Sequence, residues 1–397
     1  MDSQKVTHMG WDCHKNFSVA TGRNAQNEIV LRQRLEHADR QKLRQQLQRW
    51  PAGTPVVLEG TFGWGWVCDE LQEAGHEPHL ASSRKVAGWR QARGLPKSNK
   101  IDADLLSELW PEKPRWWEVW LAPQAVRDQR ELLRYRMALV QTQTMTKNRI
   151  HATLHRHGIL HGFGDLFCKK GLAFLCDLVE GEEPLRASTR QTLGGYLKLL
   201  EQVRRQIAQA TRILRKEVKG SAQAELWRSL PGIAWVLAYT IQAEVGDIAR
   251  FPDGRHLSSY SLLVPLAYDS GEESEDTPLG RHIGHAGRRT LKWAFIEAAH
   301  GAVKRSCFFR EVFLRRTDGG KRDRNRGYIA VGRQLCLSGY ACVKKQRRYS
   351  ETRPARPGSR KGEDMPKSQS SNSVPGSGQP LHPMAAAVPQ RRLRASL

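Results

Sequence analysis

The chain has 397 residues, with 64 Lys and Arg against 40 Asp and Glu and a formal net charge of +24 at pH 7. Hydrophobic residues make up 39% of the chain, and no stretch approaches the roughly 20 consecutive apolar residues of a membrane-spanning helix, so no membrane protein is expected. The first residues lack an apolar signal-peptide core and the seven cysteines follow no repeating spacing, which predicts a cytoplasmic protein without a disulfide framework.

The positive charge predicts a polyanionic partner. Residues 344–397 hold 12 Lys and Arg and three acids, so most of the excess charge lies in the rest of the chain. A field of this sign attracts nucleic acid and releases counterions when backbone phosphates are neutralised. We therefore expect the protein to bind DNA or RNA.

The first part of the chain alternates between strand-like and helical patterns. Three short strand-like runs come first, and a helix follows in which Leu43, Leu47 and Trp50 have helical spacing and Asp39 is the N-cap. A strand, a helix ending near Gly75, a second strand and a basic helix come next. This order is that of an RNase H-like (RuvC-type) fold with a mixed sheet, which we expect over residues 1–123. The strand-like runs are residues 5–12, 17–22, 28–35, 55–60 and 76–83, and the basic helix is 84–94.

The last segment of this domain, residues 111–123, has the composition of a linker that packs against the sheet through its tryptophans. Long amphipathic helices over 124–160 and 190–218 predict a helical hairpin or coiled coil within residues 124–224. A mainly helical domain is expected over 225–350. Residues 351–397 are rich in Pro, Ser, Gly and Arg, which predicts a disordered basic tail.

Acidic residues follow two of the predicted strands. Asp12 ends the first predicted strand, and Glu59 lies at the end of the apolar strand over residues 55–60. Both side chains can therefore project from one edge of the sheet. Asn99 and Asp102 are three positions apart on a predicted helix and share a face, whereas Asp104 should face away. Helix caps and salt bridges would also account for such acids. If the acids converge, their oxygens suit one or two Mg²⁺ ions, which can drive phosphodiester chemistry.

Several motifs, in order along the chain, carry a resemblance to a known family. The chain resembles the DEDD transposases of the IS110/IS1111 insertion-sequence family, which are related to the Piv and MooV DNA invertases. The motifs are GWDCHK from residue 10, LEGTFGWGWVCDELQEAGHEPHLASSRKVAGW from residue 58, KSNKIDADLL from residue 97, LPGIAWVLAYTIQAEVGDIARF from residue 230, SSYSLLVPLAYDSGE from residue 258, and HAGRRTLKWAFIEAA from residue 285.

This resemblance implies a catalytic machinery. It places Asp12, Glu59, Asn99 and Asp102 at the family's four acidic positions, so Asn99 stands where the family has an aspartate. It makes Ser270 the nucleophile that forms a 5′-phosphoserine link to DNA. It also implies a structured guide RNA from the element, which pairs with the element's DNA and its target, and a homotetramer whose active site combines two subunits.

Further residues of the third domain are candidates for nucleic-acid contacts. Gly232 in LPGI resembles the turn of half a helix-hairpin-helix, although a plain helix start explains it equally well. The basic residues after Ser270 can neutralise phosphates near the scissile bond, or they can form a solvated helix face. These residues are Arg281, Arg288, Arg289 and Lys292.

The sequence thus predicts a DNA transposase or site-specific recombinase. Two alternatives remain open. One is a metal-dependent nuclease resembling Holliday-junction resolvases, in which Ser270 is structural. The other is a catalytically impaired nucleic-acid-binding remnant, because Asn99 brings no charge to the acidic cluster.

Overall fold

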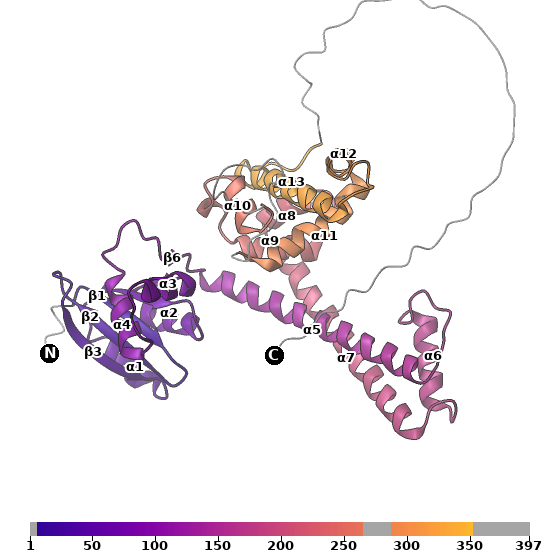
Figure 1. The fold of residues 1–397 in the computed structure, drawn as a ribbon, viewed down its shortest axis with the longest axis horizontal. Coiled ribbons are helices and arrows are strands. Elements are labelled where there is room, and N and C mark those ends of the chain that lie inside the picture. Colours follow the sequence, from indigo (N-terminus) through magenta and orange to yellow (C-terminus); the bar gives the residue numbers. More distant parts are fainter. Residues whose placement is uncertain (1–5, 265–286, 352–397) are drawn as a thin grey trace, which may run out of the picture. The chain divides into compact units, whose positions relative to one another are not determined.

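The computed structural model of the chain describes residues 6–264 and 287–351 (Figure 1). Two predicted site residues, Ser270 and Arg281, lie outside the described residues, and so does the predicted tail from residue 352 onward. Within the described ranges, no helix is both long enough and apolar enough to cross a membrane.

A mixed six-stranded sheet forms the N-terminal part of the chain, in the order β3-β2-β1-β4-β5-β6. β1 pairs antiparallel with β2 and parallel with β4, which is itself parallel to β5. The strands are β1 (His8–Cys13), β2 (Phe17–Arg23), β3 (Ile29–Glu36), β4 (Pro55–Glu59), β5 (Glu77–Ala81) and β6 (Glu118–Val119). The first five strands lie where the sequence predicts strands.

Helices cover both faces of this sheet because its central strands are apolar on both sides. Val56 and Leu58 of β4 pack with α1 (Arg40–Leu47) and α2 (Trp64–Glu73), whereas Val57, between them, packs with α3 (Ser83–Ala92) and α4 (Asn99–Glu108). Successive side chains of a strand point to opposite faces, so this alternation follows from β geometry. The predicted N-cap of α1 is confirmed, since the Asp39 side chain accepts a hydrogen bond from the Lys42 backbone amide at 2.9 Å.

The segment 111–123 packs against the sheet as predicted, and it also contributes β6, which the sequence did not predict. Trp117 is fully buried, and its Nε1 donates to the Leu109 carbonyl at 2.9 Å. β6 is two residues long and pairs antiparallel with β5, with Leu80 opposite Val119. A strand this short has no detectable period in the sequence.

Two helices of 33 residues each, α5 (Gln124–Arg156) and α7 (Ala187–Lys219), pack as an antiparallel hairpin (Figure 1). Arg136 donates to Thr211 at 2.9 Å, and further along the hairpin Leu154 and Leu193 share one apolar cluster. The hairpin prediction is therefore confirmed. Between the two helices lies α6 (Lys169–Glu180), which was not predicted.

The rest of the described chain is helical and surrounds one apolar core, in which the rings of Trp227 and Phe295 pack edge to face with their centroids 6.0 Å apart. Gly339 allows the last helix to approach this core, because a Cβ at that position would lie 1.9 Å from the Trp227 ring. The helices are α8 (Ala222–Arg228), α9 (Trp235–Val245), the 3-10 helix η2 (Ile248–Arg250), α10 (Gly254–Tyr260), α11 (Arg289–Arg305), α12 (Cys307–Arg316) and α13 (Arg324–Lys344).

Candidate active site

Asp12 and Glu59 lie side by side at the ends of neighbouring parallel strands. Trp11 of β1 is in register with Leu58 of β4, so the next residue of each strand, Asp12 and Glu59, is also at one level. The alternation of the strands places Glu59 on the same face as Val57, which packs toward α3 and α4. The two carboxylates therefore belong to one edge and one face of the sheet, as the sequence predicts.

Helix α4 crosses β1 directly beside these acids. A Cβ on Gly10 would lie 2.2 Å from the Ser107 amide nitrogen and 2.3 Å from the Ala103 carbonyl oxygen, so the helix approaches the strand as closely as a glycine permits. Asp102 precedes Ala103 in α4 and is buried. The contact thus brings Asp102 toward Asp12, which is two residues beyond Gly10 on the same face of β1.

We call Asp12, Glu59, Asn99 and Asp102 the acid edge. Burial raises the pKa of Asp12 above its ordinary value, and the negative charges of Asp102 and Glu59 raise it further, although His14 partly offsets both. Repulsion between carboxylates that share a site is a usual cause of such a shift. The three carboxylates are therefore electrostatic neighbours.

Basic side chains of the chain itself hold two of these acids. His14 Nε2 lies 2.9 Å from Asp12 Oδ2, and Arg90 of α3 donates to Asp102 Oδ1, also at 2.9 Å. Asp12 Oδ2 is buried and has no hydrogen bond of good geometry among the described residues. The sequence did not single out His14 or Arg90. His14 is part of GWDCHK, but Arg90 carries no signal in the sequence because its partner lies on another helix.

The carboxylate and amide oxygens of the acid edge suit a hard cation such as Mg²⁺, which takes oxygen ligands. Their arrangement is not yet a coordination shell. Over residues 6–264 and 287–351, no three His, Cys, Asp or Glu side chains are grouped closely enough to hold a metal ion. Metal binding would therefore require Asp12 and Asp102 to exchange His14 and Arg90 for the ion.

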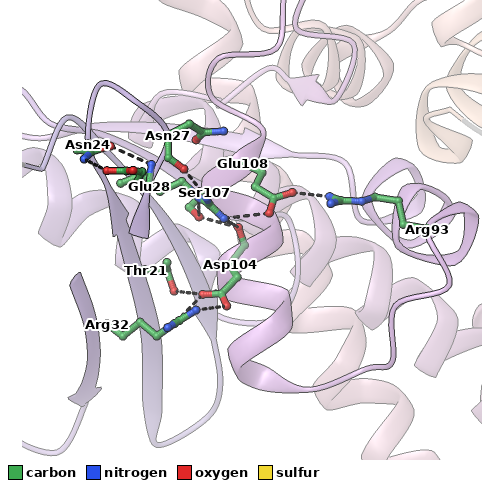
Figure 2. A network of polar contacts seen from close by, with 10 residues as sticks. Thr21, Asn24, Asn27, Glu28, Arg32, Arg93, Asp104, Ser107 and Glu108 are labelled. Carbon is green, nitrogen blue, oxygen red and sulfur yellow. Dashed lines mark hydrogen bonds and ion pairs between the residues drawn. The ribbon is translucent and has the colours of Figure 1, made fainter. Parts of the chain in front are cut away.

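Asn99 and Asp104 differ sharply in their surroundings. Asn99 is the exposed first residue of α4, one turn before Asp102 and on its face. Asp104 points away from them, toward β2 and β3, where it accepts hydrogen bonds from Thr21 at 2.8 Å and from Arg32 at 3.1 and 2.8 Å (Figure 2). Asp104 is therefore held away from the acid edge, as predicted, and does not supply the carboxylate missing at position 99.

A network at the buried side of α4 fixes this orientation. Arg23 of β2 donates to Ser107 at 2.7 Å and to Glu108 at 3.0 Å. Arg93 pairs with the other oxygen of Glu108 (Figure 2). Because a helix turned on its axis would lose these charge-assisted bonds together, the network holds the face of Asp102 toward the sheet edge.

Packing accounts for Gly232. Its φ is +83°, a left-handed conformation that favours glycine, and a Cβ there would lie 2.1 Å from the Ala298 carbonyl oxygen of α11. The Gly232 turn begins α9 and rests on α11 at Gly301. The nucleic-acid contact predicted for Gly232 stays a prediction.

The basic residues near the start of α11 lie in different environments. Arg289 is exposed and Lys292 is half-buried on the first turns of that helix. Arg288, just before the helix, donates through Nε to the Tyr260 hydroxyl at 2.9 Å and lies 3.6 Å from Glu244. The sequence did not predict these two partners.

Ser270, the predicted nucleophile, lies outside the described residues, but the structure bears on the neighbouring serines. Ser258 and Ser261 are fully buried, and their hydroxyls donate to the Gly254 and Leu257 carbonyls at 2.8 and 2.7 Å. Neither hydroxyl is available to attack a DNA strand. Among the serines shortly before Ser270, this leaves Ser259, which is exposed.

Two family models match the chain. A transposase model of the DEDD IS110 type matches residues 9–159, and a model described as the transposase IS116/IS110/IS902 family matches residues 224–312. The first match covers the acid edge and the second covers Gly232, Ser270 and the start of α11. Together the two matches cover more than half of the chain and define its class, the insertion-sequence transposases. The chain belongs to the IS110/IS1111 family of that class.

Two relatives give the extent of the similarity. The chain is 26% identical over 231 residues to the transposase for insertion sequence element IS1111A of Coxiella burnetii, which covers 56% of this chain and 60% of the relative. It is 29% identical over 109 residues to an uncharacterized 44.8 kDa protein of insertion element IS116 from Streptomyces clavuligerus, which covers 28% and 26% of the two chains. Each match spans less than two thirds of the relative.

Proposed function

We propose that this protein is a DNA transposase that cuts and rejoins DNA through a 5′-phosphoserine intermediate. Residues 1–123 form an RNase H-like domain with the acid edge, residues 124–224 form a helical hairpin, and residues 225–350 carry the nucleophile. The observation that supports this most is the convergence of Asp12, Glu59 and Asp102 at one sheet edge, in a chain of the IS110/IS1111 family.

In the proposed reaction, the Ser270 hydroxyl oxygen attacks a backbone phosphorus. A serine–phosphate bond forms at the 5′ side of the break, the bond to the 3′ oxygen breaks, and that oxygen leaves as a hydroxyl. A serine hydroxyl is a weak nucleophile and needs activation. Asp12, Glu59 and Asp102, with the amide oxygen of Asn99, would hold Mg²⁺, which when bound stabilises charge on the attacking and leaving oxygens.

The same proposal includes two partners and an assembly. A structured RNA of the element would pair with both DNAs, so that base pairing supplies sequence specificity while the basic surface supplies affinity. The active site would combine the acid edge of one subunit with Ser270 of another in a tetramer. The net charge of +24 supports binding of two nucleic acids at once.

The test incubates the full chain with element-end DNA, the adjoining RNA and Mg²⁺, and examines the products after denaturation. We expect a covalent protein–DNA adduct from the wild type and none from Ser270→Ala or Asp12→Ala, although both variants should bind DNA normally. Mixing the two inactive variants should restore part of the activity if each site is built from two subunits.

Other outcomes contradict the proposal in distinct ways. Free nicks without an adduct would show a metal-dependent nuclease. DNA binding without cleavage would show a catalytically impaired remnant, which the missing charge at Asn99 would explain. An adduct that persists in Ser270→Ala would transfer the role to the exposed Ser259. Asp12→Ala with undiminished cleavage would exclude the acid edge from catalysis.

A further inference from the structure

Three arginines from distant parts of the chain meet at the C-terminal end of α9. Arg130 of α5 donates to the carbonyls of Ala243 and Glu244 at 2.8 and 3.0 Å, and Arg250 of η2 donates to the Val245 carbonyl at 2.9 Å. Arg288 completes the group through its contact with Tyr260. We call Arg130, Arg250 and Arg288 the arginine cluster.

The negative groups around the arginine cluster do not balance its charge. Glu244 is 2% exposed, and its Oε2 lies 3.8 Å from Arg130 Nε and 3.6 Å from Arg288 Nε, beyond hydrogen-bond distance. Neither this oxygen nor the buried NH2 group of Arg250 has a hydrogen-bond partner among the described residues. Two guanidinium groups thus lie near one carboxylate without a hydrogen bond to it, and a third, that of Arg250, keeps an unsatisfied NH2 group.

The ionisation of nearby groups reflects this positive excess. Burial alone would raise the pKa of Tyr260, but the charges of Arg288 and Arg250 outweigh burial and lower this pKa below its ordinary value. Burial and the charge of Arg288 both lower the pKa of Arg130, although Tyr260 and Glu244 partly offset them. A buried cation without enough partners is costly, so an additional anion would be stabilising here.

The arginine cluster opens into a cavity of about 830 Å³. Arg130, Arg250, Arg288 and Tyr260 line it, and so do Gly60 and Thr61, the residues directly after Glu59. The cavity therefore extends from the loop that follows the acid edge to the start of α11. Its lining residues include six arginines and three acids, so the cavity is basic as a whole.

We propose that the arginine cluster, together with the Tyr260 hydroxyl, binds one phosphate of a nucleic-acid backbone. Guanidinium groups donate paired hydrogen bonds to phosphate oxygens, and a hydroxyl adds one more donor. A backbone phosphate fits better than a small free anion, because the cavity has room for the sugars and bases on both sides and adjoins the acid edge. This proposal rests on the proposed function, which supplies the nucleic acid.

The test uses the full-length protein without Mg²⁺ and two probes, inorganic phosphate and a fluorescent DNA duplex. Wild type should bind inorganic phosphate saturably in thermal-shift titrations against chloride at equal ionic strength. Arg288→Gln and Arg250→Gln should weaken this binding about tenfold, the effect of losing one charge-assisted contact. For the duplex, the slope of log affinity against log salt should become shallower by about one for each variant.

A matched control and a milder variant separate binding from misfolding. Arg205 is an exposed arginine of α7, paired with Glu201 at 3.4 Å, and Arg205→Gln should leave phosphate affinity unchanged. Tyr260→Phe keeps the ring in the core and removes only the hydroxyl, so it should weaken phosphate binding by a smaller factor than Arg288→Gln.

Three results would overturn the proposal. They are wild type without saturable phosphate binding, Arg288→Gln and Tyr260→Phe with wild-type phosphate affinity, and a duplex salt slope unchanged in Arg288→Gln. The last result, with phosphate binding lost, would make the ligand a small free anion. None of these measurements involves cleavage, so the phosphate-site proposal can be disproved without disproving the proposed function. The proposed function is disproved separately, if Asp12→Ala still cleaves DNA.

Discussion

The acid edge contains three carboxylates and one amide, and the amide at position 99 lies in solvent where a fourth charge would be tolerated. Asn99→Asp should raise Mg²⁺ affinity about tenfold, because an added ligand charge strengthens binding of a hard cation. Calorimetric titration of Mg²⁺ measures this. Unchanged affinity would show that Asn99 lies outside the metal site.

Asp104 provides the matched control for that substitution. It lies on the same helix, but Arg32 and Thr21 hold its carboxylate. Asp104→Asn should therefore leave Mg²⁺ affinity unchanged, while the loss of its half-exposed ion pair lowers the free energy of unfolding by about 1 kcal/mol or less. Weaker Mg²⁺ binding in Asp104→Asn would mean that α4 rotates when the metal binds.

The raised pKa of Asp12 predicts a cost in stability. The folded metal-free protein holds the Asp12 proton more tightly than the unfolded chain does, so its stability falls as the pH rises from the ordinary value of 3.8 through the raised folded pKa. Asp12→Asn should consequently raise the melting temperature at about pH 7 in a chelating buffer. The gain should vanish at acidic pH. A lower melting temperature at neutral pH would mean that the pairing with His14 outweighs burial.

Among the structural elements, the contact of the α9 turn with α11 makes the sharpest prediction. Gly232→Ala adds a Cβ that would lie 2.1 Å from the Ala298 carbonyl oxygen, in a left-handed conformation. Strain and overpacking together should lower the free energy of unfolding by about 2–5 kcal/mol, measured by urea denaturation.

Gly53 separates these two causes. Its φ is +72° and a Cβ there would meet nothing within 4 Å, so Gly53→Ala carries the backbone strain alone, about 1–2 kcal/mol. If Gly232→Ala were no more destabilising than Gly53→Ala, the close approach to α11 would not be what requires the glycine, and the predicted phosphate contact would become the better explanation.

The elements that the sequence predicted are those with a repeating apolar pattern. β4 is continuously apolar because it is buried on both faces, and α5 and α7 repeat apolar residues over many turns. β6 was missed because two residues show no period, and its pairing depends on β5. Helix α6 was missed for a different reason: it is only 12 residues long and has Gly171 in its first turn, which weakens its helical signal.

The same distinction applies to the candidate site. Asp12 and Glu59 were predictable because each ends an apolar strand, and strand ends meet at one edge. The arginine cluster was not predictable, because Arg130 and Glu244 lie 114 positions apart and meet only through the packing of α5 on α9. Only Arg288 was a candidate from the sequence, through its place in a basic run, whereas Arg130 and Arg250 gave no signal because arginines are common in this chain.

For the whole molecule, the distribution of charge determines how strongly nucleic acid is bound and how salt weakens it. Localised sites such as the arginine cluster contact single phosphates, whereas many dispersed Lys and Arg contribute bulk affinity through released counterions. The two contributions differ in sensitivity: a substitution in one site changes the salt slope by about one, and removal of a basic segment changes it by several.

Deleting residues 352–397 tests the dispersed contribution. This segment carries eight Lys and Arg and two acids, and its few large apolar residues predict no part in a core. The deletion should weaken DNA and RNA binding modestly and make the salt slope shallower by about two or more, measured by fluorescence anisotropy across a salt series. The free energy of unfolding should change by less than about 0.5 kcal/mol.

Replacing the eight basic residues by Gln in the full chain is the control, since an equal change in the salt slope assigns the effect to charge. Loss of stability on deletion, with the Gln variant unaffected, would show that the segment packs against the rest of the protein.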